Sequence, residues 1–149
     1  MTGTIDTSEV LAAATALFCE YAVTVDEARP DDFARLFCDG AVFFSDEVVG
    51  PEAIGAHCRT LLSQMERTSH HISNVRVVSV GDEEATVDAY VYAWHVMNGG
   101  EIWEVWGRYF STLRRVEGRW LFADHRIRSA GVRPDHAFPN SARLDRATL

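Results

Sequence analysis

Residues 85–97 read ATVDAYVYAWHVM, and after the turn Asn98-Gly99-Gly100 the chain continues over residues 101–116 with EIWEVWGRYFSTLRRV. Both stretches are rich in the β-branched and aromatic residues that favour strands, and an Asn-Gly step between them is typical of a hairpin turn. Two further strands are predicted over residues 70–80 and 119–130, bounded by Gly81-Asp82 and Glu117-Gly118. The sequence therefore predicts four long antiparallel strands that follow one another directly.

The first third of the chain has a helical pattern instead. Apolar side chains recur every three or four positions over residues 8–25, and Asp6 and Glu9 have the spacing of a capping box. A short second helix is predicted from Pro30 to near Gly40, and a β-rich segment covers residues 41–49. Gly50-Pro51 then opens a third helix, whose apolar stripe runs from Ile54 to Met65.

Helices followed by antiparallel strands are the pattern of an α+β fold, in which each helix buries its one apolar stripe against the sheet. The large aromatic residues of the strands leave two arrangements open: a strongly curved sheet around an apolar pocket, or simple packing of the helices on the sheet. We expect residues 1–149 to form a single domain with a core over about residues 8–131. Residues 132–149 are expected to form a tail that either frays or lies across a neighbour.

Composition excludes several classes of function. The chain has 14 Lys and Arg against 22 Asp and Glu, a net charge of −8, which argues against nucleic acid or an anionic membrane as partner. The first residues, Met1–Asp6, lack the basic start and apolar run of a signal peptide, and no apolar stretch reaches membrane-spanning length. A cytoplasmic protein is therefore expected. Cys19, Cys38 and Cys58 lack metal-binding spacing and are predicted to be buried, reduced thiols.

Asp26 is the first residue that suggests chemistry. It follows Phe18 by eight positions and Ala22 by four, so its carboxylate projects from the flank of the buried helical stripe. A half-buried carboxylate needs a cation or several hydrogen bonds, and such a group is suited to proton chemistry. The alternative is that Asp26 only ends the helix or caps the next turn within a solvated acidic run.

His70 and His71 are adjacent in a predicted strand, so their side chains lie on opposite faces. This geometry argues against a zinc pair, and no metal site is predicted. An imidazole beside a buried acid can accept a proton, because the carboxylate fixes its tautomer and stabilises the imidazolium that forms. His70 is thus a candidate general base. The alternative is a structural histidine with satisfied hydrogen bonds.

Two further residues are candidates. Arg108 shares a strand face with Trp106 and Phe110, and if buried it would polarise a substrate oxygen, whereas an exposed arginine would pair with acids. His95 has the strand parity of small apolar residues such as Ala93, which predicts a buried face. A Gly-rich phosphate loop and a Gly-x-Ser-x-Gly motif are both missing from the sequence, and no cofactor is expected.

Five segments, in order, resemble the SnoaL-like branch of the nuclear-transport-factor-like superfamily. They are residues 21–26 (YAVTVD), 32–37 (DFARLF), 70–77 (HHISNVRV), 107–109 (GRY) and 118–122 (GRWLF). The resemblance covers about Val10 to Gly131. It implies a cone-shaped barrel, in which three N-terminal helices close the mouth of a strongly curved, mainly antiparallel sheet that encloses an apolar pocket.

The resemblance also implies a function. Scytalone dehydratase and hexachlorocyclohexane dehydrochlorinase, both in this superfamily, use an aspartate near the end of the first helix and a histidine at the start of a strand to abstract a proton; these match Asp26 and His70. By resemblance the chain is a cofactor-independent lyase, isomerase or cyclase that forms a homodimer or other homo-oligomer and acts on a small hydrophobic, aromatic or polyketide molecule. The residues expected to bind this molecule are Tyr21, Phe43, Trp94, His95, Trp106, Arg108 and Phe110.

The sequence departs from these relatives at several positions. The dehydratase's paired tyrosines are matched by Val25 and by Phe44 or Ser45, its second histidine is matched by Phe110, and the dehydrochlorinase's lysine is matched by Tyr21. The segment from His70 to Asn74 also resembles the small subunit of ring-hydroxylating dioxygenases, whose role is mainly structural. A non-catalytic subunit or ligand-binding protein is therefore the alternative function.

Overall fold

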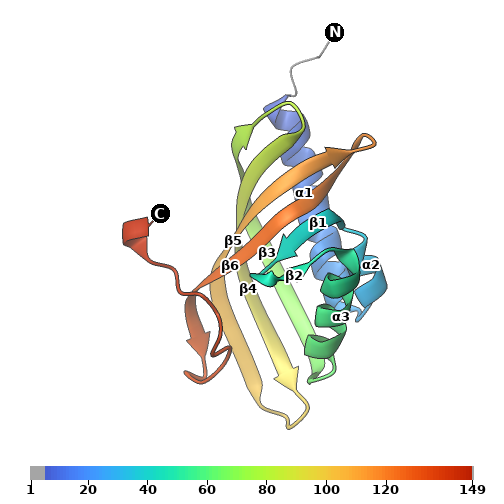
Figure 1. Ribbon diagram of the computed structural model, residues 1–149. Coiled ribbons are helices and arrows are strands. Elements are labelled where there is room, and N and C mark those ends of the chain that lie inside the picture. Colours follow the sequence, from blue (N-terminus) through green and yellow to red (C-terminus); the bar gives the residue numbers. More distant parts are fainter. Residues whose placement is uncertain (1–5, 149) are drawn as a thin grey trace.

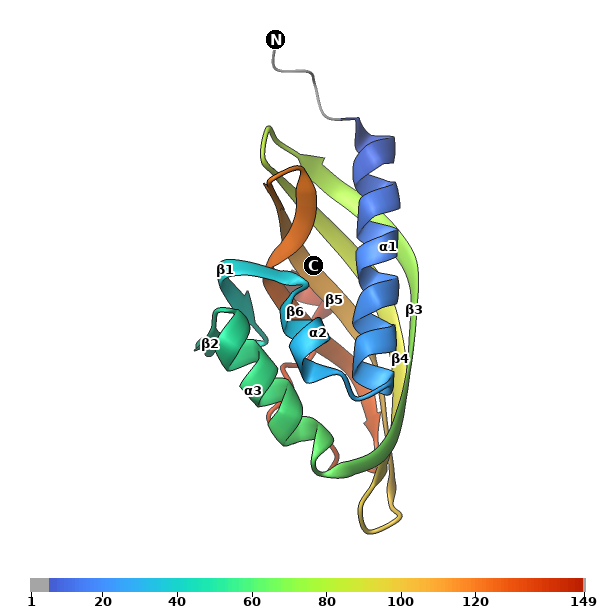
Figure 2. The same ribbon diagram turned by 90° about the vertical axis from the view of Figure 1, so that its right-hand side faces the viewer.

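The computed structural model describes residues 6–148 and places the helices against one face of a single sheet (Figures 1 and 2). The elements are α1 (Thr7–Asp26), α2 (Pro30–Ala34), β1 (Phe37–Phe43), β2 (Ser45–Val49), α3 (Pro51–Leu62), β3 (Met65–Val80), β4 (Glu84–Met97), β5 (Ile102–Val116), β6 (Arg119–Arg133) and the 3₁₀ helix η1 (Arg146–Thr148). The expectation that the chain lacks a signal peptide rests on residues 1–6, and residues 1–5 lie outside the described residues.

The sheet is mixed and open. Its strand order is β2-β1-β6-β5-β4-β3, so β3 to β6 form the predicted antiparallel meander. β1 runs parallel to β6, and β2 pairs only with β1. The chain has the expected α+β class. Because β2 and β3 lie at opposite edges of the sheet and do not pair with each other, the sheet does not close, and the expectation of a barrel is wrong. Figure 2 shows the long strands bending beside α1.

The two faces of the sheet differ because side chains alternate along each strand. The inner face packs against α1 and carries the fully buried rings of Tyr109 and Phe122, which pack with Phe18 of α1. The outer face is turned away from the helices and carries residues of the opposite parity, such as Tyr90 and Arg108. Which face a residue occupies therefore decides whether it lies near α1.

Helix α1 supplies much of the core. Its buried side chains are Val10, Ala14, Leu17, Phe18, Tyr21 and Thr24. The helix is long and apolar enough to cross a membrane, but this is weak evidence, since the core helix of a soluble protein has the same properties. Asp6 caps its N-terminus and accepts a hydrogen bond from the Ser8 backbone N–H at 3.1 Å. Glu9 pairs with Arg115 at 3.5 Å, not with the cap.

Several predicted boundaries shift because strand pairing outweighs the local pattern. The second helix ends at Ala34 and not near Gly40, since Phe37 already pairs with Phe122 of β6. β3 begins at Met65, which pairs with Met97 and does not belong to the preceding helix.

Two other expectations need correction. Cys19 is exposed, whereas Cys38 and Cys58 are buried, and all three are free thiols. Part of the C-terminal segment lies against the sheet, whereas η1 at its end projects away from the body of the molecule (Figure 1). The part against the sheet returns to β6, where the Ser129 backbone N–H donates to the Ala142 carbonyl at 2.8 Å and its carbonyl accepts from the Leu144 N–H at 2.9 Å.

Candidate active site

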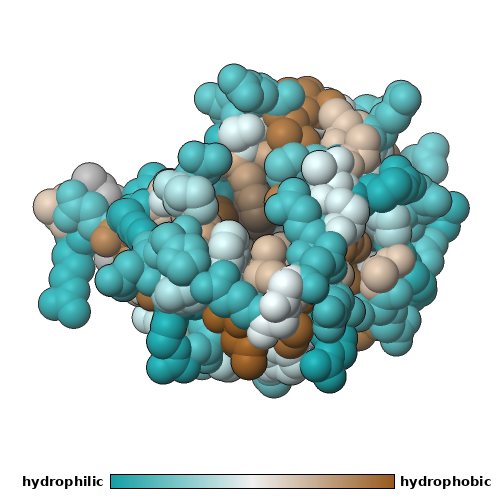
Figure 3. Space-filling model, turned by 90° about the horizontal axis from the view of Figure 1, so that it is seen from below, coloured by the Kyte–Doolittle hydropathy of each residue, from teal (hydrophilic) through white to brown (hydrophobic). Residues whose placement is uncertain are grey.

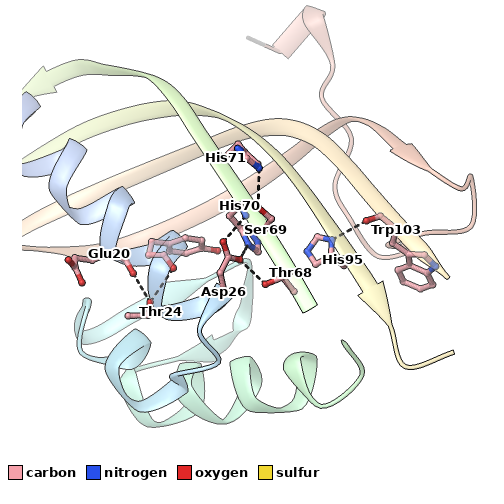
Figure 4. Close-up of polar contacts among 10 residues, drawn as sticks. Glu20, Thr24, Asp26, Thr68, Ser69, His70, His71, His95 and Trp103 are labelled. Carbon is pink, nitrogen blue, oxygen red and sulfur yellow. Dashed lines mark hydrogen bonds and ion pairs between the residues drawn. The ribbon is translucent and has the colours of Figure 1, made fainter. Parts of the chain in front are cut away.

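Asp26 and His70 form a hydrogen-bonded pair between the end of α1 and the inner face of β3 (Figure 4). Asp26 Oδ1 lies 2.7 Å from His70 Nδ1, and Asp26 Oδ2 accepts the His70 backbone N–H at 2.9 Å. An ionised carboxylate can only accept, so Nδ1 carries the proton and the Nε2 of a neutral His70 is a proton acceptor. Asp26 therefore is the last residue of the helix and also binds the histidine, rather than lying in a solvated acidic run.

A third donor fixes the carboxylate. Thr68 precedes His70 by two residues on the same strand face, and its hydroxyl donates to Asp26 Oδ1 at 2.7 Å. Burial alone would raise the pKa of Asp26, but the hydrogen bonds from the His70 ring, the His70 backbone and Thr68 outweigh it and lower the pKa. Asp26 is thus ionised at neutral pH. The Asp26 side chain is 26% exposed and that of His70 is 9% exposed.

His95 of β4 lies beside this pair. Its ring is perpendicular to that of His70, with 5.4 Å between centroids. Its Nδ1 is 3.3 Å from the Trp103 carbonyl oxygen, which can only accept, so Nδ1 is the protonated nitrogen. Burial, and secondarily the charge of His70, lowers the pKa of His95 to about 4. A neutral His95 therefore faces His70 at neutral pH, on the buried strand face that its parity predicts.

Two other residues predicted to bind substrate, Tyr21 of α1 and Phe43 of β1, are buried in the core. The Tyr21 ring lies 6.3 Å from that of His70, and burial, reinforced by Tyr109, raises the pKa of Tyr21 far above its ordinary value. The Tyr21 hydroxyl is thus protonated at neutral pH, and it is hydrogen-bonded to Tyr109. Phe43 lies deeper in the core, stacked on His125 at 5.8 Å.

His125 of β6 is a fully buried histidine that the sequence pattern does not single out. Its Nδ1 is 2.8 Å from the Ser111 hydroxyl, while its buried Nε2 has no hydrogen-bond partner within residues 6–148. Burial lowers the pKa of His125 to about 3, so it is neutral. A bulge in β6, opposite Thr112 and Leu113, interrupts the alternation of side chains between the two faces of the sheet. Phe122 and His125 are therefore both buried although three positions separate them, and alternation alone did not place His125.

Four residues predicted to bind substrate lie elsewhere. Trp94, Trp106, Arg108 and Phe110 have the opposite strand parity to His95 and Tyr109 and project from the outer face. The face shared by Trp106, Arg108 and Phe110 was predicted, but it is not the one that meets α1. Arg108 pairs there with Asp88 at 2.7 Å, as the alternative interpretation expected of an exposed arginine, although its side chain is only 14% exposed. The histidine beside His70 is His95, so Phe110 does not occupy that place.

The C-terminal segment also reaches the site. Phe138 lies 5.0 Å from the His95 ring and 5.3 Å from the Trp103 ring. Seen from the end of the molecule that holds the β4–β5 turn, apolar surface is recessed between hydrophilic residues (Figure 3). Across residues 6–148, His, Cys, Asp and Glu side chains form no group of three that could hold a metal ion.

A helix laid across a long, bent, mixed sheet, with an aspartate–histidine pair between them, defines a protein of the nuclear-transport-factor-like superfamily. More specifically, the chain belongs to the SnoaL-like domain family, whose sequence profile matches residues 6–126. The comparison with curated protein sequences gives no match.

Solved structures share the fold over nearly the whole chain. A candidate scytalone dehydratase from Novosphingobium aromaticivorans DSM 12444 is 25% identical, with a TM-score of 0.84 over 95% of this chain and 97% of that one. A candidate aromatic ring hydroxylase from the same species is 27% identical, with a TM-score of 0.77 over 83% and 90% of the two chains. A type 2 hexachlorocyclohexane dehydrochlorinase is 18% identical, with a TM-score of 0.77 over 95% and 97%.

Proposed function

We propose that this protein is a cofactor-independent lyase or isomerase, a class that includes cyclases, in which His70 removes a proton from carbon and Asp26 orients it. The observation that carries the proposal is the 2.7 Å contact between Asp26 Oδ1 and His70 Nδ1. That contact leaves Nε2 without a proton in the neutral ring, which is the state a general base requires.

The surrounding groups favour this direction of proton transfer. As Nε2 takes the proton, His70 becomes an imidazolium, and the ionised Asp26 stabilises the new charge at hydrogen-bond distance. His95 is neutral at that moment, so the imidazolium meets no second cation across the 5.4 Å between the rings. Its unprotonated Nε2 can accept a hydrogen bond from a substrate hydroxyl.

The substrate is a small hydrophobic or aromatic molecule, polyketides included, with an acidic C–H beside a carbonyl or a leaving group. Two observations support this: the core around Tyr21 is aromatic, and the similar structures include a candidate scytalone dehydratase and a dehydrochlorinase. General-base catalysis supplies only about 10²–10⁴-fold, so orientation within the apolar interior must contribute the rest.

The experiment is hydrogen exchange in D₂O. A panel of small cyclic aryl ketones is incubated with the protein, and loss of the proton next to the carbonyl is followed by NMR. We expect the wild type to accelerate exchange and His70→Ala to return it to the buffer rate. His71→Ala is the matched control, because His71 is the next residue but lies exposed on the outer face beside Tyr92. Equal rates for the wild type and His70→Ala would reject the proposal.

The alternative is a non-catalytic or ligand-binding role like that of a dioxygenase small subunit. The 27% identity to a candidate aromatic ring hydroxylase favours it. The two functions differ in assembly. Our proposal expects a cytoplasmic homodimer that purifies by itself, whereas the alternative expects a stable complex with a much larger iron-containing chain. Size-exclusion chromatography of the protein purified from its native cells separates the two.

A further inference from the structure

A second hollow lies on the outer face of the sheet, away from the Asp26–His70 pair. It has a volume of about 300 Å³ and is lined by Asn74, Arg76, Asp88, Tyr90 and Arg108 from β3, β4 and β5. This volume is at the lower end of the range, roughly 300–1,000 Å³, of small-molecule sites. The sheet separates this hollow from the proposed catalytic residues, so the inference does not depend on the proposed function.

The hollow carries a local positive charge in a chain whose net charge is −8. Arg76 contacts the Asp88 carboxylate through Nε at 3.1 Å and Nη2 at 2.5 Å, and Arg108 contacts it through Nη2 at 2.7 Å. The Asp88 side chain is 5% exposed. One buried carboxylate thus stands between two guanidinium groups, and one positive charge is left over to attract an anion.

The Arg108 guanidinium is held in place but is not saturated with hydrogen bonds. It packs over the rings of Tyr90 and Phe110, each 5.1 Å from its central carbon. Its Nε is buried and has no hydrogen-bond partner within the described part of the chain. An unpaired donor on a charged group is unfavourable, and rings on which the guanidinium stacks fix its plane. The positive charge of Arg108 is therefore held in one orientation towards an anion in the hollow.

We propose that this hollow binds a small planar monocarboxylate, with its carboxylate against Arg76 and Arg108 on the solvent side of Asp88 and its ring on Tyr90. The Tyr90 side of the hollow suits a ring, because Tyr90 is 48% exposed and offers an aromatic surface to solvent. Arg76 is largely exposed and can swing over the ligand while Arg108 stays fixed.

The test is a titration with benzoate, monitored by backbone amide NMR at low ionic strength. We expect saturable binding with a dissociation constant on the order of 1 mM, and shifts confined to residues around the hollow. Benzamide, the neutral analogue, is expected to cause no saturable shifts. Arg108→Gln is expected to weaken benzoate binding by about tenfold or more, and Arg108→Lys, which keeps the charge but not the planar fork, by less.

Two controls separate this site from others. Arg126→Gln removes an arginine of β6 that does not line the hollow and is bound to Asp124 and Asp46. This variant is expected to leave benzoate binding unchanged. Asp26→Asn is also expected to leave it unchanged, since it alters only the inner face. The proposal is overturned by shifts that map to His70 and His95, by binding that survives Arg108→Gln, or by an absence of saturation up to 20 times the expected constant, about 20 mM. Equal binding of inorganic phosphate would overturn the carboxylate assignment.

Discussion

The inner and outer faces of this sheet each hold a half-buried or buried aspartate with a basic partner, but the partners differ in kind. On the inner face Asp26 binds His70, and on the outer face Asp88 binds Arg76 and Arg108. Histidine gains and loses a proton near neutral pH, whereas arginine stays charged. The inner pair is therefore suited to transfer protons, and the outer cluster to hold an anion and to stabilise the sheet.

The same lesson applies to neighbouring residues of one strand. His70 faces α1 and Asp26, while His71 is exposed and packs near Tyr92. A shift of one position exchanges the two faces. The chemistry of each position thus follows from strand parity as much as from residue type, and matched substitutions on the two faces separate the roles.

The largest expected effect comes from Asp26→Asn on the inner face. The amide presents an N–H₂ as well as an oxygen, so it no longer holds the Nδ1-protonated tautomer and cannot stabilise an imidazolium. We expect the exchange rate in D₂O to fall about 10²–10⁴-fold, with the free energy of unfolding changed by only about 1 kcal/mol. Wild-type exchange by a folded Asp26→Asn protein would contradict the role of Asp26.

For Asp88→Asn on the outer face, we expect a loss of stability without a loss of proton exchange. This change leaves two arginines, one of them largely buried, without a counter-charge. We expect urea denaturation to show a loss of about 3 kcal/mol in the free energy of unfolding. The D₂O exchange rate, measured under conditions where the variant is folded, is expected to match the wild type. A variant that kept its stability but lost exchange would show that the two faces are not independent.

Acid is expected to lower the free energy of unfolding of the protein through two buried histidines of the inner face, His95 and His125. Burial lowers the pKa of His125 to about 3 and that of His95 to about 4, from an ordinary 6.5. Between pH 6.5 and these values the unfolded chain binds protons that the folded chain does not, so the free energy of unfolding falls as the pH falls. At pH 5 the loss is on the order of 2 kcal/mol per histidine. Asp26, with its lowered pKa, loses its contribution only at lower pH, below its ordinary value of 3.8.

Urea denaturation at pH 7 and pH 5 measures this effect. The double variant Ser111→Ala with His125→Leu is the control, because it removes both members of a buried polar pair. We expect it to be at least as stable as the wild type at pH 7 and to lose less stability at pH 5. An equal loss in both proteins would exclude His125 as a source of the acid sensitivity.

How much of this could be predicted from the sequence depends on the range of the interaction. Periodicity found α1 and the four-strand meander, because those patterns are local. It misplaced the end of α2 and the start of β3, where pairing of Phe37 with Phe122 and of Met65 with Met97 decides the structure. Strand parity put His70 and His71 on different faces, and it grouped Arg108 with Trp106 and Phe110.

Parity could not say which group faces the helices, since outer residues such as Phe110 and Trp106 are as aromatic as inner ones. Thr68 was missed as well, although it precedes His70 by two residues and so shares its face. The Phe138 contact with His95 depends on how residues 134–148 fold back, and nothing in their composition indicates that path.

The smallest expected effect is at Phe138, which covers His95 on the inner face. Phe138→Ala opens this contact to water and reduces the burial that lowers the pKa of His95. We expect an NMR titration to show the pKa of His95 rising from about 4 towards its ordinary value of 6.5. An unchanged His95 would mean that Phe138 does not exclude water from it.

The central claim is that Asp26 holds the proton of His70 on Nδ1 and leaves Nε2 free to act as a base. Long-range ¹H–¹⁵N NMR of the imidazole rings at neutral pH reads this tautomer directly. We predict an Nδ1-protonated His70 with an unprotonated Nε2, a pattern that is lost in Asp26→Asn. A His70 protonated on Nε2, or one that averages between the two tautomers, would contradict the account.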